Sequence, residues 1–415
     1  MKTPAKLISC IVFPVILAAS LTIINRTLEP KYTLSTSDWP TTSTFNQFYR
    51  MDRDSIEVLF FGSSIAASAF VPQVLYDEYG MTSYNLACEL QNIFFSYYWL
   101  EEALHYQSPR AVVLDLEFMN DYYPENRLNT KESISRKSID PMRWSLNKVK
   151  AVHHICTLDR SQSELSYYLT NIRYHSRWPE VSLRDLDIEM TENAPLKGFA
   201  PVNENAPEEA GPYIPGRTDE KYAFQEVMQE YLDRIVKLCR EKGISLMLVS
   251  LPGDTMNDSI NFTHESYADG NGILYLNLCT PEQINRIGAF FPEENIYYHE
   301  NIWGAVKTSR YIGALLAENY EIEPLTDPQY ESSKEYFRQI LDSFNLTRIT
   351  DAGEYRRALE RPYFRVFETT DDTINIDGEE FRSEDSGVNI VVYDLNMQRV
   401  MDFVTLQGQT LIRHY

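Results

Sequence analysis

The stretch that decides the fold is "IEVLFFGSSIAASAFVP", residues 56–72. An apolar run rich in β-forming residues ends at Gly62, two serines follow, and small residues then open a segment of helical character. This pattern predicts a strand that passes through a tight turn into a helix. Ligands of an open parallel sheet bind beyond the carboxyl ends of its strands. Ser63 and Ser64 therefore stand where a nucleophile would be needed, although two serines can also simply form a turn.

The same succession of strand, turn and helix recurs along the chain. Helical segments alternate with short apolar runs, which lie at residues 57–62, 82–87, 111–118, 244–254 and 271–278. This alternation predicts an α/β domain over residues 29–325, with three layers in which helices cover both faces of a parallel sheet. Residues from about 122 to 215 break the pattern, and we interpret them as a helical insertion over one edge of the sheet. Alternating residues in "NIVVYD" (389–394) and "RVMDFVTL" (399–406) predict a β-hairpin within a small C-terminal β-rich domain, residues 326–415.

The N-terminus carries an apolar segment. Residues 7–24 form 18 uncharged, mostly apolar residues behind Lys2 and Lys6, which is near the minimum length of a transmembrane helix. The small residues 18–20 are an alternative signal-peptide cleavage site, but the apolar run continues to Ile24 and favours an uncleaved anchor, residues 1–28. Both interpretations predict that the rest of the chain lies outside the cytoplasm, and the anchor predicts a single-pass protein of the cell membrane.

Composition narrows the function classes. The net charge is −22 and no run of Lys or Arg stands out, which argues against nucleic acid as a partner. The 28 tyrosines and 20 phenylalanines suit a cleft that contacts sugars. The five cysteines and seven histidines show no ligand-like spacing, so we predict neither a metal site nor a cofactor.

A nucleophilic serine needs a base within hydrogen-bond reach. His299 differs from the other histidines because it immediately precedes a predicted helix, residues 303–320, that must return against the same sheet. That location brings it to the end of the sheet at which Ser64 stands. We therefore predict that Ser64 and His299 form a pair.

These residues resemble those of the SGNH (GDSL-like) hydrolases, and most closely their membrane-anchored, extracytoplasmic members related to teichoic-acid D-alanylation and alginate acetylation proteins. The stretches that carry the resemblance are "FFGSSIAASAFVPQVL", "YNLACELQ", "RAVVLDLEF", "LMLVSLP" and "HENIWGA". The resemblance implies a flavodoxin-like sheet, Ser64 as nucleophile and oxyanion donor, Ser63 in place of the family's aspartate, and His299 as general base. It further implies a serine acyltransferase or esterase that modifies a cell-surface polysaccharide or teichoic acid, with a multispanning membrane acyltransferase as partner.

One difference from the family supports a second hypothesis. The aspartate usually found three residues before the histidine is replaced by Ile296, so the orienting carboxylate would have to come from Glu294 or Glu300. The alternative is that the chain is a catalytically inactive SGNH-fold protein, which binds glycans or serves as a scaffold in a polysaccharide modification complex.

Further candidate residues follow from the same motifs. Asn85 and Asn120, after the second and third predicted strands, are candidate oxyanion donors, and each is equally compatible with capping a turn. In "YHSRW" (174–178), His175 and Arg177 are candidates for binding an anionic or polyhydroxylated substrate, with an aromatic packing unit and a structural ion pair as the alternative. Asn301, within "HENIWGA", is a further candidate for substrate binding.

Overall fold

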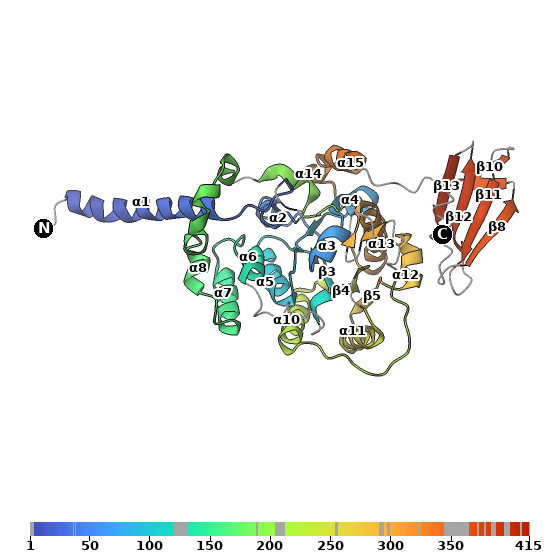
Figure 1. Ribbon diagram of the computed structural model, residues 1–415, viewed down its shortest axis with the longest axis horizontal. Coiled ribbons are helices and arrows are strands. Elements are labelled where there is room, and N and C mark those ends of the chain that lie inside the picture. The colour runs from blue at the N-terminus through green and yellow to red at the C-terminus, as the bar shows by residue number, and fades with distance from the viewer. Residues whose placement is uncertain are drawn as a thin grey trace.

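The computed structural model describes residues 4–343 and then strands between residues 365 and 414. The gaps within these spans are residues 36, 38, 120–131, 188–189, 204–211, 254–255, 290–293, 297–298, 323, 372, 377–378, 383–386, 394–398 and 407–408. Figure 1 shows a central α/β domain, the long helix α1 (Pro4–Leu28) at its N-terminal end, and a separate sheet formed by the C-terminal strands.

The central sheet consists of five parallel strands in the order β2-β1-β3-β4-β5. Their bounds are Val58–Phe61 (β1), Ser83–Asn85 (β2), Ala111–Asp115 (β3), Ser245–Ser250 (β4) and Leu274–Asn277 (β5). The predicted parallel sheet is thus confirmed, and its strand order is that of flavodoxin-like sheets. β2 lies on one side of β1, and β3, β4 and β5 follow on the other, so the strand order switches between β1 and β3, which is where such sheets bind ligands.

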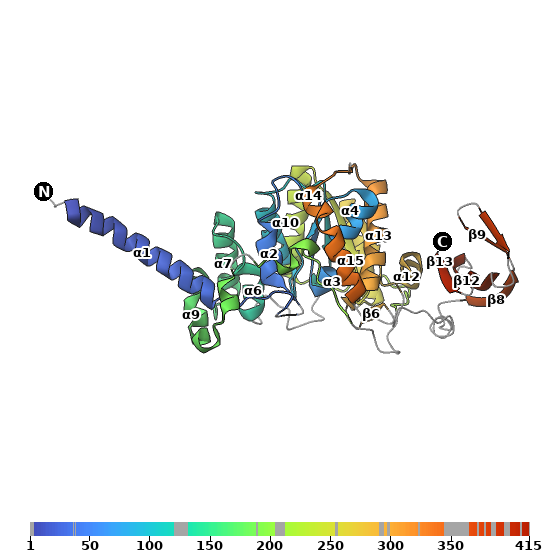
Figure 2. The ribbon, with the colours of Figure 1, turned by 90° about the horizontal axis from the view of Figure 1, so that it is seen from above.

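Strands β1, β2, β3 and β4 are buried on both faces, while the edge strand β5 is partly exposed, and successive side chains of a strand point to opposite sides of the sheet. In β1, Leu59 and Phe61 join the core on one face, while Val58 and Phe60 join the core on the other. The first core also contains residues of α2 (Thr41–Phe48), α5 (Ile93–Ala103) and α10 (Glu226–Lys242). The second contains residues of α3 (Ser64–Ala69), α4 (Pro72–Tyr79), α12 (Pro281–Ile287) and α13 (Ile302–Asn319), and Figure 2 shows these two layers from above.

Side-chain caps and glycines determine where several of the helices begin and end. Asn92 accepts a hydrogen bond from the backbone of Phe95 and so caps α5, and Asn257 caps α11 (Asp258–Asn271) in the same way. Gly243, which the sequence predicts as the end of α10, adopts the left-handed conformation with φ of 68°.

The predicted insertion is helical in the residues that the structure describes. It contains α6 (Glu132–Ile139), α7 (Leu146–Leu158), α8 (Glu164–Tyr168) and α9 (Asn171–Tyr174), followed by the 3₁₀ helices η3 (His175–Glu180), η4 (Leu183–Leu186) and η5 (Thr191–Leu196). Helices α7, α8 and α9 lie near the base of α1 in Figures 1 and 2. Within the described part of the chain, no helix is both long and apolar enough to cross a membrane. The anchor predicted from residues 7–24 stays a prediction.

Two short helices extend the α/β domain beyond residue 325. Helices α14 (Pro328–Glu331) and α15 (Lys334–Ser343) fall in the span that sequence analysis assigns to the C-terminal domain. They pack on the α/β domain, because Tyr330 is buried and donates to the Ser83 carbonyl of β2 at 2.5 Å, and Phe337 joins a core cluster with Val71 and Phe199. Burial of these two aromatic side chains fixes both helices to the domain.

The C-terminal strands form two antiparallel sheets. β13, β12, β11 and β8 form one sheet, and β10 pairs with β9 in the other. The predicted hairpin is confirmed, since β11 pairs antiparallel with β12. The bounds of these strands are Arg365–Asp371 (β8), Thr373–Ile376 (β9), Glu379–Arg382 (β10), Gly387–Tyr393 (β11), Arg399–Leu406 (β12) and Gln409–His414 (β13).

Candidate active site

The turn between β1 and α3 places the two serines in different environments. Gly62 has φ of 151°, and a Cβ atom at this position would lie 2.6 Å from the Cβ of Asp115 on the neighbouring strand. Only glycine fits such a conformation without strain. Ser63 caps α3, because its Oγ accepts from the Ile65 amide at 3.1 Å and donates to Asp115 Oδ2 at 3.4 Å. Ser63 therefore holds the turn, while Ser64 is the first residue of the helix.

Ser64 and His299 are brought together across 235 residues of sequence. The Nε2 atom of His299 lies 2.9 Å from Oγ of Ser64, within hydrogen-bond distance. His299 belongs to the two-residue strand β7 (His299–Glu300), which pairs with β6 (Asn295–Ile296) just before α13. The hydroxyl of Ser309 on α13 accepts from the Val71 amide at 2.7 Å and donates to the Ala69 carbonyl at 3.0 Å. This double hydrogen bond fixes α13, and with it the histidine, against α3.

The imidazole of His299 is enclosed mainly by apolar surroundings. It is partly buried, and desolvation lowers its pKa to about 4. The indole ring of Trp39 lies beside it, with 4.7 Å between the ring centroids. His299 is therefore neutral at neutral pH and able to accept a proton at Nε2.

Neither glutamate considered as its partner contacts His299. Glu294 accepts hydrogen bonds from Nζ of Lys307 on both carboxylate oxygens, each at 2.6 Å. Glu300 points to the opposite side of β7, where its Oε1 accepts from Oγ of Thr308 at 2.5 Å. Among the described residues, no carboxylate forms a hydrogen bond with His299. Within the described residues, the base of the serine and histidine pair thus has an aromatic ring beside it and no hydrogen-bonded carboxylate.

A carboxyl pair that sequence analysis did not identify lies beneath the serine turn. Asp115 at the end of β3 is buried, and burial raises its pKa to about 7 although the Ser63 amide and hydroxyl both donate to it. Burial also raises the pKa of neighbouring Glu117 well above its usual range. The signal in the sequence was the aspartate that ends the apolar run "AVVLD", at the strand beside β1. Its contacts support the turn from below and do not reach Ser64.

The candidate oxyanion donors differ in what they contact. The Asn85 side chain is fully buried, and its Nδ2 donates to the carbonyls of Ala66 at 2.9 Å and Phe70 at 3.1 Å. Its Oδ1 accepts from the Ala87 amide at 3.1 Å. Asn85 therefore ties the end of β2 to α3, and both of its amide hydrogens are engaged there. Asn120 lies outside the described residues. The remaining candidate is the amide of Ser64 itself, in the first turn of α3.

The candidate substrate-binding residues lie at separate places. Oδ1 of Asn301 accepts from the amides of Trp303 at 3.1 Å and Gly304 at 3.2 Å, so this side chain caps α13. Arg177 donates to the Leu28 carbonyl at 2.7 Å and pairs with Asp185 at 3.0 Å, in a structural ion pair at the base of α1.

His175, the second candidate residue of "YHSRW", is exposed. Nδ1 of His175 lies 3.0 Å from the Ile172 carbonyl in the preceding helical turn. None of the contacts described for His175, Arg177 or Asn301 joins them to Ser64.

Comparison with known proteins adds no family assignment. The chain matches no protein-family model and no curated protein. In the part of the chain that the structure describes, no three His, Cys, Asp or Glu side chains gather in a way that could hold a metal ion. The site therefore has to be interpreted from its own geometry.

Proposed function

We propose that this protein is a serine acyltransferase or esterase of the SGNH type, with Ser64 as nucleophile and His299 as general base. The observation that carries the proposal is the 2.9 Å separation between Ser64 Oγ and His299 Nε2 at the carboxyl end of β1. A hydroxyl and a neutral imidazole at this distance are the minimum required for acyl transfer through serine.

The geometry supports a two-step reaction. Ser64 Oγ attacks the carbonyl carbon of an ester while its proton passes to His299 Nε2, and the leaving alcohol then takes that proton as the C–O bond breaks. Water or a sugar hydroxyl then attacks the acyl-serine and gives its proton to His299 Nε2. The bond between the acyl carbon and Ser64 Oγ breaks, and Ser64 Oγ takes the proton back from His299. The Ser64 amide in the first turn of α3 is placed to donate to the developing oxyanion.

Trp39 takes part of the role that an aspartate has in a triad. When His299 is protonated during the reaction, the imidazolium lies within the range of a cation–π contact with the indole ring, 4.7 Å away. Such a contact is worth roughly 0.5–2 kcal/mol, which is less than a buried carboxylate provides. We therefore expect a slower enzyme than one with a complete triad.

The sequence supports a location and a substrate class for this activity. The apolar segment of residues 7–24 supports a single membrane anchor with an extracytoplasmic α/β domain. We propose a cell-surface polysaccharide or teichoic acid as acceptor, and a multispanning acyltransferase as the partner that supplies the acyl group. These assignments rest on the resemblance of "GSS" and "HENIWGA" to anchored SGNH proteins.

Covalent labelling of the serine tests the proposal. The full-length protein in a neutral detergent is incubated with a fluorophosphonate, and the modified residue is located by peptide mass spectrometry. We expect label on Ser64, none in Ser64→Ala, and a rate at least about 100-fold lower in His299→Ala, because general-base catalysis contributes about 10²–10⁴-fold.

Two matched variants control for indirect effects. Ser68→Ala removes a buried hydroxyl of the same helix that donates to the Ile65 carbonyl, and His153→Ala removes an exposed histidine. Both should label as the unmodified protein does. Folded protein that is not labelled at Ser64 would support the inactive glycan-binding or scaffold protein instead, and direct binding of the purified polymers would then be measured.

A further inference from the structure

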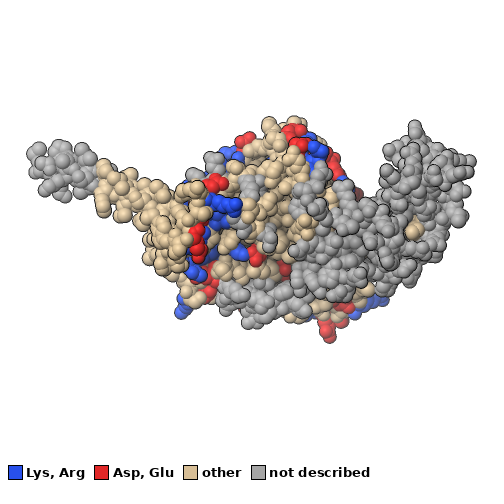
Figure 3. Space-filling view, turned by 45° about the horizontal axis from the view of Figure 1, so that its top comes forward, with Lys and Arg blue, Asp and Glu red and all other residues tan. Residues whose placement is uncertain are grey.

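A cavity lies at the base of α1, and its lining is basic. It has a volume of about 560 Å³ and is bounded by α1, α2 and the helices of the insertion. Figure 3 shows charged side chains gathered where the surface of α1 meets the body of the protein. In a chain of net charge −22, this lining has only two acidic residues against five basic ones: Arg26, Lys31, Arg50, Arg143 and Lys148.

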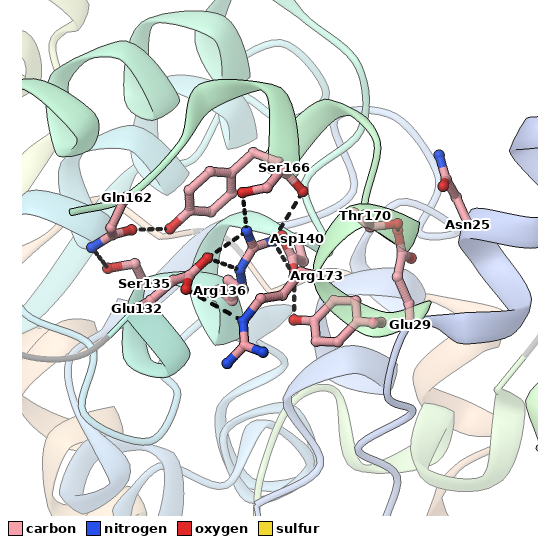
Figure 4. A network of polar contacts seen from close by, with 12 residues as sticks. Asn25, Glu29, Glu132, Ser135, Arg136, Asp140, Gln162, Ser166, Thr170 and Arg173 are labelled. Atoms are coloured by element: carbon pink, nitrogen blue, oxygen red, sulfur yellow. Dashed lines mark hydrogen bonds and ion pairs between the residues drawn. The ribbon is translucent and has the colours of Figure 1, made fainter. Parts of the chain in front are cut away.

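The two acidic residues of the lining are engaged with other side chains. Asp140 accepts from Arg136 at 3.3 Å and from the Tyr174 hydroxyl at 2.7 Å, and burial raises its pKa to about 6. Glu29 accepts from the Thr170 hydroxyl at 2.7 Å. Figure 4 shows this network, in which Arg136 lies against Asp140. An ion pair with Arg136 offsets the charge of Asp140, so the cavity keeps a positive excess.

Lys148 is a buried cation without an ion-pair partner. Its side chain is 5% exposed, and Nζ donates to the carbonyls of Asp140 at 3.1 Å and Met142 at 2.9 Å. No carboxylate of the described residues lies within ion-pair distance of it, and burial lowers its pKa. A buried charge is costly unless it is paired, and an ammonium group has a third hydrogen to donate. The carboxylates of Asp140, Glu29 and Glu102 act on Lys148 only from beyond ion-pair distance, and an anion in the cavity would supply a direct counter-charge.

A second cation on the cavity wall is held in place by an aromatic ring. The guanidinium of Arg143 lies 4.3 Å from the ring centroid of Tyr49. Stacking leaves the edge of the guanidinium fork available, and this fork matches the oxygens of a phosphate group. Arg and Lys together are the usual ligands of phosphate, which offers several acceptor oxygens to a converging set of donors.

Exposed apolar surface continues from the cavity. Trp144, which lines the cavity, is 68% exposed and lies 5.0 Å from the Tyr168 ring, and α1 exposes Phe13 and Ile23 among other large apolar residues. Helix α1 rises about 1.5 Å per residue, so its apolar surface extends roughly 20 Å beyond Arg26. A ligand with a phosphate at one end and an apolar chain at the other would match both surfaces.

We propose that this cavity binds a phosphate group, carried by the headgroup of an amphiphile whose apolar chain lies along α1. The site is separate from Ser64 and does not depend on the proposed acyl transfer. Lys148 and Arg143 are the main phosphate ligands.

Binding of defined phosphates tests the site in the full-length protein. In a maltoside detergent, calorimetry measures binding of sn-glycerol 3-phosphate and of inorganic phosphate. Native mass spectrometry in the same detergent compares retention of phosphatidylglycerol with that of diacylglycerol, which has the same apolar chains and no phosphate. We expect Arg143→Gln and Lys148→Met to weaken phosphate binding at least about tenfold, because a charge-assisted hydrogen bond contributes about 1.5–3 kcal/mol.

The controls separate this site from folding and from catalysis. Lys150→Gln removes an exposed lysine of the same helix and should bind normally. Ser64→Ala should also bind normally, which distinguishes failure here from failure of the proposed enzyme. Arg143 is exposed, so its variant remains informative if Lys148→Met does not fold.

The two arms of the experiment identify the source of the phosphate. Preference for phosphatidylglycerol over diacylglycerol supports a lipid headgroup, and binding of sn-glycerol 3-phosphate alone supports the phosphate site with a soluble ligand in place of the amphiphile. The proposal is overturned if no phosphate binds in either arm, or if Arg143→Gln and Lys150→Gln behave alike.

Discussion

The low pKa of His299 leads to an unusual pH dependence for the reaction of Ser64. Desolvation lowers this pKa to about 4, and among the residues that the structure describes no carboxylate hydrogen-bonds to the ring to raise it again. Only the neutral imidazole can accept the serine proton. With this pKa, about 97% of the imidazole is neutral at pH 5.5, whereas an ordinary histidine with a pKa near 6.5 would be only about 10% neutral at the same pH. The labelling rate should therefore change less than about 1.5-fold between pH 7.5 and 5.5.

The assay follows the second-order rate constant of fluorophosphonate labelling between pH 4 and 8. His299→Ala gives the baseline that does not depend on the base, and circular dichroism at each pH verifies that the protein remains folded. A roughly tenfold fall between pH 7.5 and 5.5 that disappears in His299→Ala would refute our account of the histidine environment.

Asp115 is a second group that can titrate between pH 4 and 8, and an Asp115→Asn variant controls for its contribution to the labelling rate. Burial raises the pKa of this carboxyl to about 7, and it accepts from the Ser63 amide and hydroxyl beneath the turn. An inflection near pH 7 that disappears in Asp115→Asn belongs to Asp115. One that persists in this variant and disappears in His299→Ala belongs to His299.

Two further predictions concern the segment that carries the base. A Cβ atom on Gly304 would lie 2.3 Å from the Glu294 carbonyl oxygen, so Gly304→Ala should lower the free energy of unfolding by about 1–3 kcal/mol. Gly270→Ala in α11, where a Cβ meets nothing within 4 Å, should raise it by about 0.5–1 kcal/mol, and equal effects in urea denaturation would contradict the packing argument. Burial raises the pKa of Glu300 to about 8, so its folded form binds a proton more tightly than the unfolded chain. The raised pKa therefore lowers the free energy of unfolding as pH rises. This loss is absent below about pH 4.5, grows as pH rises to 8, and reaches at most about 5 kcal/mol. The melting temperature of Glu300→Gln, relative to that of the unmodified protein, should therefore increase from pH 5 to pH 8. A difference in melting temperature that stays constant over this range would show that Glu300 is ionised throughout.

The sequence predicts the sheet and the Ser64 and His299 pair well, because both depend on local patterns. β1 is an apolar run that stops at a glycine, and His299 is fixed by the helix that follows it. The geometry of parallel strands then brings the two residues to the same edge. No contact between them has to be known in advance.

The surroundings of the pair could not be predicted, because they depend on packing between distant segments. Trp39 comes from the stretch before the sheet and lies beside His299. Glu294 could orient the histidine by its place in sequence, but Lys307 engages both of its oxygens. Asn85 is near the site, yet its amide hydrogens are donated to the carbonyls of Ala66 and Phe70. Buried polar groups are usually hydrogen-bonded, and for Glu294 and Asn85 the partners that satisfy them cannot be recognised from their places in the sequence.

The double hydrogen bond of Ser309 has a consequence for folding. Residues 64 and 299 are 235 positions apart, and the contact of Ser309 with Ala69 closes a similarly long loop. Contacts of such long separation form late, because the entropy of closing the loop must first be overcome. Reactivity of Ser64 during refolding would therefore appear last and would report a completed domain, whereas circular dichroism would rise earlier with the helices.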